Sequence, residues 1–342
     1  MQKDTFYALS AEEQCDRLGR LAKQALHAWG VNNCEPRLIK HRENAVFAVQ
    51  TRAGDPAVLR VHRQDYHSDE SLAAELDWMS TLANGGIVVP RPLPTLSGEI
   101  MTKAGNDEVT GSWQLDMLSW LDGEQLGDIG VPLNLGTRDV GQVFFELGRT
   151  IATMHNISEA LPQQMQVTRH AWDTNGLIGD APLWGRFWEL GALTQAQRDC
   201  LLEAKTAIAE DLSAYGQSPS NYGLIHADLV PENIFLSTSG IQLIDFDDSG
   251  FGWHMFEIVT TLFWLTGEPQ FEEIESQLLA GYRSMRNLPS GDLETMTLFF
   301  AARSLSYVGW VHTRQSTVTA IEMTPMIIEL AMNICRRYLA GR

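Results

Sequence analysis

The stretch that decides the fold is Leu224–Asp248, which reads LIHADLVPENIFLSTSGIQLIDFDD. It is mainly apolar, as buried strands are, yet a set of polar residues recurs through it: His226, Asp228, Asn233, Asp245, Asp247 and Asp248. Burying an unpaired carboxylate costs several kcal/mol, a large part of the stability of one domain. These charges therefore need compensation.

The polar residues are expected to meet at one end of a hairpin. The runs NIFLS and IQLID flank a Thr-Ser-Gly turn, which is typical of two antiparallel strands. Because a hairpin returns to its origin, Asn233 and Asp245 should lie at the same end. Asp228 precedes the first strand on a loop that Pro231 stiffens.

The segment between Lys205 and Arg283 contains no Lys or Arg, although it holds twelve carboxylates. Neighbours in sequence cannot neutralise its buried acids, so a cation from solution is the natural candidate. Mg²⁺ prefers one or two carboxylates with an amide oxygen, water and substrate phosphates. We therefore expect Asn233 and Asp245 to bind the metal and Asp228 to serve the chemistry.

The spacing matches a kinase signature. In protein kinases an Asp follows a His by two positions, an Asn follows that Asp by five, and a metal-binding Asp stands later in a D-F-G turn. Here His226, Asp228 and Asn233 have this spacing, and Asp245 begins a D-F-D sequence. Motif and strand context together predict catalytic roles for Asp228, Asn233 and Asp245.

The sequence resembles the aminoglycoside phosphotransferase and choline kinase-like family, which shares the protein-kinase fold. HADLVPENI is similar to its H-G-D-x-x-x-x-N loop, and LIDFDDSGFG to its I-D-(W/F)-(D/E) segment. ENAVFAV, VLRVHR, ELDWMSTL, VPRPLPT, WLDGE and DFDDSGFGWH resemble the bacterial branch with stress-response and homoserine kinase-like phosphotransferases. The resemblance runs from about residue 40 to 260. It implies an α+β, two-lobed protein-kinase-like fold, with an antiparallel sheet and a helix in the N-lobe and a mainly helical C-lobe.

Three positions depart from the family pattern. Ala227 replaces the more usual Gly, and Glu257 stands where Asp is common. Arg60 stands where many relatives carry the ATP-binding Lys. Because Arg stays charged and contacts phosphate through two donors, nucleotide binding should survive this exchange.

The surrounding patterns predict a lobe boundary near residue 120. Residues 1–120 begin with a helix that stops at Gly30 and continue with strands rich in β-branched residues, which predicts a nucleotide-binding lobe. Ser68 should cap a helix that ends at Asn84. Residues 121–342 are mainly helical and are expected to form the catalytic and acceptor-binding lobe.

Several residues of the first lobe are expected to bind the nucleotide. Glu75 falls on the core side of its helix, where a carboxylate needs a partner, and Arg60 is expected to be that partner. Asn44 lies in the loop HRENAVF, which would cover the nucleotide. The backbone of Leu118, Ser119 and Trp120 would meet the base in the interlobe cleft.

Less specific interpretations compete with some of these roles. His226 is more typical of a brace for its loop than of a proton carrier. Asp247 is a candidate second metal ligand or acceptor contact. Asp248 could have the same roles, but a helix-capping role before GFGW explains it equally well. Four tryptophans are more typical of core than of a ligand cage: Trp172, Trp184, Trp188 and Trp310.

The motifs predict a kinase that uses ATP and Mg²⁺, with GTP as the alternative nucleotide, and transfers the γ-phosphoryl group to a hydroxyl. A small cationic acceptor is favoured, since no long activation segment follows Asp245 and the second lobe is acidic. The alternatives are a stress-response type Ser/Thr protein kinase, a pseudokinase-like nucleotide-binding module and a metal-dependent hydrolase.

Composition limits the partners and the compartment. The net charge of -18 disfavours nucleic acid and anionic membranes, which bind Lys and Arg. The four cysteines are scattered without a C-x-x-C pair, so neither a disulfide framework nor a zinc site is expected. The apolar segments near Val259 and from Met296 are read as buried helices and no secretion signal is evident, which together predict a cytoplasmic protein. The oligomeric state is left open.

Overall fold

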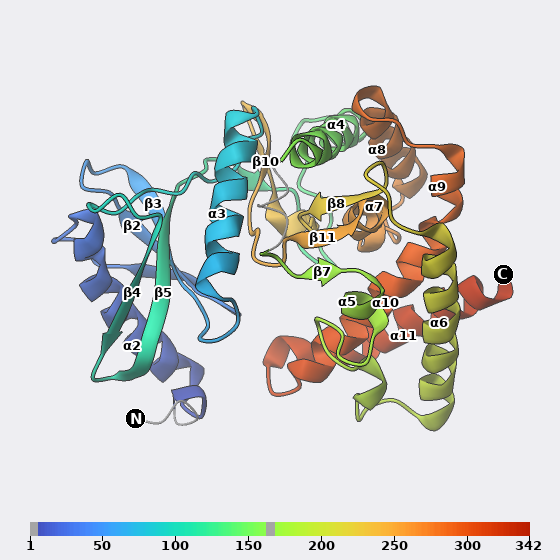
Figure 1. The fold of residues 1–342 in the computed structure, drawn as a ribbon, viewed down its shortest axis with the longest axis horizontal. Helices are drawn as coiled ribbons and strands as arrows, with labels where there is room; N and C mark the ends of the chain where they lie inside the picture. The colour runs from blue at the N-terminus through green and yellow to red at the C-terminus, as the bar shows by residue number, and fades with distance from the viewer. Residues whose placement is uncertain (1–5, 162–167) are drawn as a thin grey trace. The chain divides into compact units, whose positions relative to one another are not determined.

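The computed structural model describes residues 6–161 and 168–342. The chain divides into two compact units, Met1–Asp122 and Gly123–Arg342 (Figure 1). The first unit is built on a sheet, and the second is mainly helical with two small sheets.

The first unit contains a five-stranded antiparallel sheet in the order β1-β2-β3-β5-β4. Its strands are β1 (Arg37–His41), β2 (Ala45–Gln50), β3 (Pro56–Val61), β4 (Met101–Asn106) and β5 (Val109–Ser119). The predicted antiparallel strands are confirmed. In the register of β3 with β5, Arg60 stands opposite Asp116, so the two side chains lie close enough to interact.

The helices of this unit include two α-helices and a 3-10 helix. α2 (Ala11–Ala25) is followed by the 3-10 helix η1 (Leu26–Trp29), which ends at Gly30 with φ 72°, as glycine readily allows. α3 (Asp69–Asn84) begins where Ser68 Oγ accepts the Ser71 N–H at 3.2 Å. The predicted cap and both predicted helix ends are confirmed.

The second unit holds two three-stranded sheets. One has the order β10-β9-β6, with β6 (Glu124–Gln125), β9 (Ile234–Ser237) and β10 (Gly240–Leu243). The other has the order β7-β11-β8, with β7 (Ala171–Trp172), β8 (Tyr222–Ile225) and β11 (Gly250–Trp253). β9 and β10 form the predicted hairpin, with Ser237 opposite Gly240. Sequence reasoning missed β6, β7, β8 and β11.

The other regular elements in the described residues of this unit are helices. The longer ones are α4 (Val140–Glu159), α6 (Gln195–Tyr215), α7 (His254–Phe263), α8 (Phe271–Met285), α10 (Met296–Thr313) and α11 (Val318–Ala340). The short ones are α5 (Thr174–Ile178), η3 (Phe187–Glu189), η4 (Pro231–Asn233) and α9 (Ser290–Glu294). α4 and α8 lie side by side in Figure 1 and pack so closely that a Cβ on Gly148 would lie 2.0 Å from the Leu278 carbonyl oxygen.

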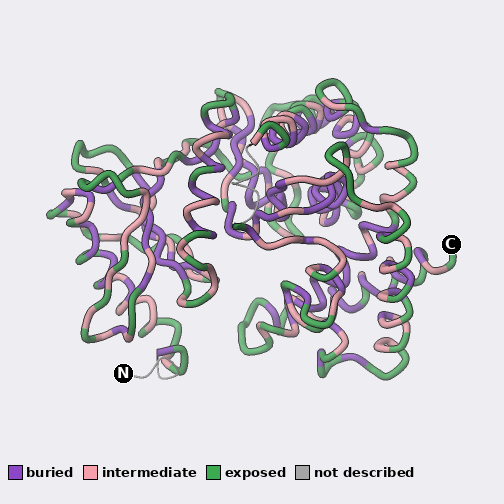
Figure 2. The backbone as a smooth tube through the Cα atoms, in the orientation of Figure 1, coloured by how far each residue is buried: buried purple, intermediate pink, exposed green. Residues whose placement is uncertain are grey.

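The core of the second unit centres on α7 and α10. Every residue of α7 is buried, and α10 is buried over most of its length (Figure 2). Two charged side chains in these helices, Glu257 and Arg303, have no exposed surface. Because buried charges are costly, each must have polar partners.

α11 is long and apolar enough, by length and composition, to cross a membrane. In the structure it packs against α10 and α6, and one third of its most apolar window is buried. Pro325 lies inside it. A helix at the edge of a globular core can have the same length and composition. This one helix is therefore weak evidence for a membrane protein.

Candidate active site

The motif loop connects β8 to the hairpin. β8 ends at Ile225, and η4 leads directly into β9. The hairpin ladder continues one step beyond β10, because the Ile244 N–H donates to the Asn233 carbonyl at 3.0 Å. Asn233 and Asp245 therefore stand at the same end of the hairpin, as the turn signature predicted.

Asp228 lies on this loop with its side chain 22% exposed. Asn233 Nδ2 donates to the Asp228 carbonyl at 2.8 Å and to the carboxylate Oδ2 at 3.2 Å. The other carboxylate oxygen, Oδ1, accepts from Arg303 Nη2 at 2.7 Å. Since each oxygen has a donor of its own, the carboxylate is held in one orientation.

Arg303 is a site residue that the sequence patterns did not single out. It lies in α10, 75 residues after Asp228. The expectation that the buried acids need a cation from solution is therefore wrong for Asp228, because a distant part of the chain supplies the charge. The available signal was the single Arg inside the otherwise apolar run MTLFFAARSLSYVGWV.

Glu257 and His226 brace the same loop. The buried Glu257 carboxylate accepts the backbone N–H groups of His226 and Ala227. The His226 Nε2–H donates to the Ile244 carbonyl at 2.9 Å, while Nδ1 accepts the Asp228 N–H at 3.3 Å. The interpretation of His226 as a brace is confirmed. Burial raises the pKa of Glu257, an effect that His226 and the two N–H groups oppose.

The two functional loops each contain a residue in the left-handed region. Ala227 and Asp245 both have φ 66°. This conformation costs a residue with a Cβ about 1–2 kcal/mol, which is why glycine is favoured there. Ala227 therefore holds a strained backbone conformation next to Asp228. Such strain persists only where surrounding contacts enforce it.

The segment after β10 turns sharply at Asp245, whose side chain is exposed, and Asp247 is buried. Arg169, at 7% exposed, donates to the Asp247 carbonyl at 2.6 Å and to the Ser249 carbonyl at 2.7 Å. Sequence reasoning missed Arg169, which shows no motif of its own. It fixes the backbone of this acidic turn.

Asp248 does not cap a helix. It precedes strand β11, and its Oδ1 accepts from Trp184 Nε1 at 3.0 Å. The capping interpretation is wrong because α7 begins only at His254. Trp184 is buried, as the core interpretation predicted, and so is Trp172, whereas Trp188 and Trp310 are partly exposed.

The acids of this end of the hairpin repel one another. Burial, together with the charges of Asp228, Asp247 and Asp245, raises the pKa of Asp248 to about 7. Within residues 6–161 and 168–342, no group of three or more His, Cys, Asp or Glu side chains forms a ready metal cluster. One exposed carboxylate, one amide and an excess of negative charge fit Mg²⁺, which takes its remaining ligands from water and phosphate.

The first unit contains a second buried ionic group. Arg60 Nη1 donates to Glu75 Oε1 at 2.9 Å, so the predicted pair is confirmed. Arg60 also donates to both oxygens of Asp116, at 2.9 and 2.8 Å, and His62 Nε2 lies 2.6 Å from Asp116 Oδ2. Asp116 and His62 were missed, because their contact depends on the register of β3 with β5. Two carboxylates on Arg60 hold its guanidinium in a fixed position.

The other predicted nucleotide residues occupy defined positions in the first unit. Asn44 is buried between β1 and β2, and its Oδ1 accepts the Arg63 N–H at 3.2 Å. Leu118 and Ser119 end β5, and the Ser119 N–H donates to the Arg91 carbonyl at 2.8 Å. A base would therefore not find this donor available. Trp120 follows and is 36% exposed.

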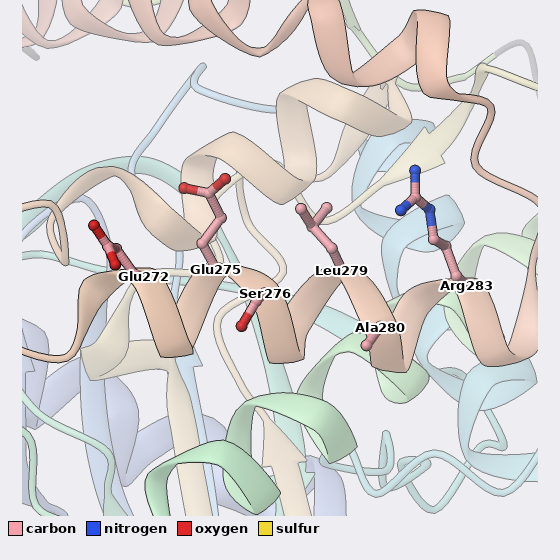
Figure 3. Close-up of a pocket in the computed structure, with 6 residues that line it drawn as sticks. All are labelled: Glu272, Glu275, Ser276, Leu279, Ala280 and Arg283. Carbon is pink, nitrogen blue, oxygen red and sulfur yellow. The ribbon is translucent and has the colours of Figure 1, made fainter.

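A pocket of about 460 Å³ lies along α8 (Figure 3). All of its lining residues come from this one helix: Glu272, Glu275, Ser276, Leu279, Ala280 and Arg283. Burial and the neighbouring Glu272 raise the pKa of Glu275. None of the motif residues contributes to it, so the hairpin end, with its paired polar groups, remains the candidate active site.

Comparison with known proteins identifies the family. Residues 35–293 match the phosphotransferase enzyme family. The chain belongs to this family. The phosphotransferase is 24% identical over 299 residues to amicoumacin kinase from Bacillus subtilis (strain 168), which covers 84% of the chain and 83% of the relative. The predicted membership is confirmed, and the protein is a kinase that phosphorylates a hydroxyl at the expense of ATP.

Solved structures of kinases share the fold. A microcompartment-associated aminopropanol kinase superimposes with a TM-score of 0.80 and is 28% identical, covering 94% of this chain and 97% of that one. An amicoumacin kinase in complex with AMP-PNP and Ca²⁺ has a TM-score of 0.74 at 21% identity, covering 98% and 96%. The predicted α+β kinase-like fold of the phosphotransferase is confirmed.

Proposed function

We propose that this phosphotransferase moves the γ-phosphoryl group of ATP to the hydroxyl of a small amino alcohol, with Mg²⁺ as the metal. The observation that carries the proposal is the pairing of Asp228 with Asn233 at the end of the hairpin where Asp245 also stands. In a chain of this family, these residues supply a base, an amide ligand and a carboxylate ligand at one place.

Asp228 acts on the acceptor. Its Oδ2, which carries the longer of the two hydrogen bonds, orients the acceptor hydroxyl and receives its proton. The acceptor oxygen then forms a bond to the γ-phosphorus while the bond to the bridging oxygen breaks, and ADP leaves. Catalysis of this kind depends mainly on positioning and on charge neutralisation.

Asn233 and Asp245 are the proposed ligands of Mg²⁺, with Asp247 as a second metal ligand or an acceptor contact. When bound, the metal neutralises the developing charge on the β- and γ-phosphates. Burial, and after it the charges of Asp228, Asp247 and Asp245, raise the pKa of Asp248, and these clustered carboxylates support a cation at this place. The complex of an amicoumacin kinase with AMP-PNP and Ca²⁺ supports a divalent cation in this fold.

The first unit is proposed to bind the nucleotide. Arg60, held by Glu75 and Asp116, would orient the α- and β-phosphates through its fixed guanidinium. The loop around Asn44 would lie over the nucleotide. The base would meet the backbone around Leu118, Ser119 and Trp120, and chiefly Trp120, since the Ser119 N–H already has a partner.

The acceptor class follows from charge and from one relative. Acidic side chains lie near the proposed base, where they would attract a cationic acceptor. The aminopropanol kinase is named for an acceptor that has both an amine and a hydroxyl. Nothing in these observations favours a protein Ser/Thr acceptor. We place the activity in the cytoplasm, where ATP and Mg²⁺ are available.

The test is turnover with a panel of amino alcohols, hydroxy amino acids and a generic protein, with ADP release and ³¹P NMR as readouts. Asp228→Asn should lower kcat by about 10³-fold and leave the KM for ATP within about twofold, because it removes the base but no nucleotide contact. Near wild-type turnover in that variant would show that Asp228 is not the base. ATP consumption with water as the sole acceptor would show that the proposed acceptor class is wrong.

A further inference from the structure

Arg303 is enclosed by aromatic rings inside the second unit. Its Cζ lies 4.4 Å from the ring centroids of both Trp184 and Tyr307, and 5.5 Å from that of Phe256. Arginine stacks well on such rings, yet burying its charge remains costly without an anionic partner. The rings therefore fix the position of the guanidinium. Its role depends on the anionic group with which it pairs.

Two of the hydrogen-bond partners of Arg303 are consecutive residues of the motif loop. Nη2 donates to Asp228 Oδ1 at 2.7 Å, and Nη1 donates to the Ala227 carbonyl at 3.2 Å. Nη2 also donates to the Tyr307 hydroxyl at 3.0 Å, one turn further along α10. One rigid group thus holds both the carboxylate and the backbone that carries it.

We propose that Arg303 is the positioning residue for the catalytic base. By holding Oδ1, it directs Oδ2 of Asp228 toward the acceptor hydroxyl and balances a charge that sits among other acids. This inference rests on the proposed function, in which Asp228 is the base. Arg303 itself does not contact substrate, because it has no exposed surface.

A purely structural role would have different consequences. α10 is buried, so removing any large side chain from it should lower the free energy of unfolding. Such a loss would affect folding but would not reduce kcat selectively in the molecules that do fold. A positioning role predicts that kcat falls while the KM for ATP does not change.

The first experiment compares Arg303→Met with Arg303→Lys. Misplacing a reacting group costs about 10²-fold in rate, so Arg303→Met should lower kcat by at least that factor at an unchanged KM for ATP. Arg303→Lys keeps the charge but loses the planar pair of donors, so it should recover part of kcat. Unchanged kcat in Arg303→Met would overturn the proposal.

The matched control is Arg286→Met. The Arg286 side chain is 9% exposed and bonds to Asn156 and Glu159, and, as for Arg303, its Nε has no hydrogen-bond partner within the described residues. It should lose stability, as Arg303→Met does, but keep kcat. An equal fall of kcat in both variants would show a general effect of removing a buried arginine and would overturn the proposal.

Chemical rescue covers the case in which Arg303→Met does not fold. Millimolar guanidinium should raise kcat of Arg303→Ala, whose short side chain leaves room for it, whereas NaCl at equal ionic strength should not. If guanidinium does not raise kcat of Arg303→Ala and Arg303→Lys has wild-type kcat, the proposal is wrong.

A double-mutant cycle separates this proposal from the proposed function. In Asp228→Asn, adding Arg303→Met should cost far less kcat than it does in the wild type. If Asp228→Asn is fully active, the assignment of the base fails. If Asp228→Asn is inactive but the two losses are independent, only the role of Arg303 fails.

Discussion

Two buried arginines of this phosphotransferase form ion pairs with carboxylates. Arg60 is paired with two carboxylates, Glu75 and Asp116, and all three side chains are nearly or fully buried. Arg303 is enclosed by rings and paired with Asp228. Because a buried charge that loses its partner costs several kcal/mol, each of these pairs is sensitive to single substitutions.

The pair of Asp116 with Arg60 should make stability depend on pH. Burial alone would raise the pKa of Asp116, but Arg60 and His62 outweigh it and lower the pKa from 3.8 to about 2. Since the folded-state value is the lower one, the stabilisation is present above about pH 4 and is lost as pH falls toward 2. The difference corresponds to about 2 kcal/mol.

Asp116→Asn tests this through urea unfolding at several pH values. The variant should be less stable than the wild type at pH 7, and the gap should narrow below pH 4. Asp55→Asn, at an exposed turn, is the control and should change little at any pH. A gap of constant size from pH 7 to pH 3 would contradict the assignment.

Whole elements are held in place by a few close contacts. α7 reaches the motif loop through Glu257, and α4 meets α8 where Gly148 leaves no room for a side chain. The contact of Glu257 positions the motif loop of the active site, whereas the contact at Gly148 allows α4 and α8 to pack closely. The two should therefore respond differently to substitution.

Glu257→Asp should reduce activity by shortening the brace. The carboxylate would no longer reach the N–H groups of both His226 and Ala227, and a displaced loop should lower kcat by about 10²-fold. Glu257→Gln keeps the length of the side chain but has only one acceptor oxygen. Its kcat should therefore lie between those of the wild type and Glu257→Asp. Steady-state kinetics of both variants check this prediction, and Glu203→Asp, at an exposed position, is the control. Wild-type kcat in Glu257→Asp would show that Glu257 does not hold the motif loop in its active position.

Gly148→Ala should destabilise the second unit. The added Cβ would lie 2.0 Å from the Leu278 carbonyl oxygen, which forces α4 and α8 apart and costs about 1–3 kcal/mol or more. Gly291→Ala in α9 adds a Cβ where no atom lies within 4 Å and should be neutral or slightly stabilising. Thermal unfolding distinguishes the two, and equal melting temperatures would refute the close contact.

At the scale of the whole molecule, the net charge of -18 shapes ligand binding. A free nucleotide is itself an anion and meets an acidic protein. A divalent cation offsets both charges, so nucleotide and metal should bind together rather than separately.

ATP with Mg²⁺ should therefore raise the melting temperature by a few degrees, the order of effect expected at about 100 times the dissociation constant. ATP with EDTA should give a much smaller rise. Asp245→Asn should remove most of the difference between the two conditions. An equal rise with and without metal would exclude the proposed metal site.

Local pattern was enough to predict much of this molecule. The Thr-Ser-Gly turn places Asn233 and Asp245 at one end of the hairpin, because pairing between adjacent strands depends on a few neighbouring residues. The Ser68 cap and the side of α3 that carries Glu75 also follow from short-range rules.

Tertiary structure alone decided which charges meet. The contacts of Arg303 with Asp228, of Asp116 with Arg60 and of Trp184 with Asp248 join residues 75, 56 and 64 positions apart. No spacing rule encodes them, because they depend on how buried helices and strands pack. The sequence by itself determined the polar groups of the site, and the packing of the chain determined the cation that compensates its base.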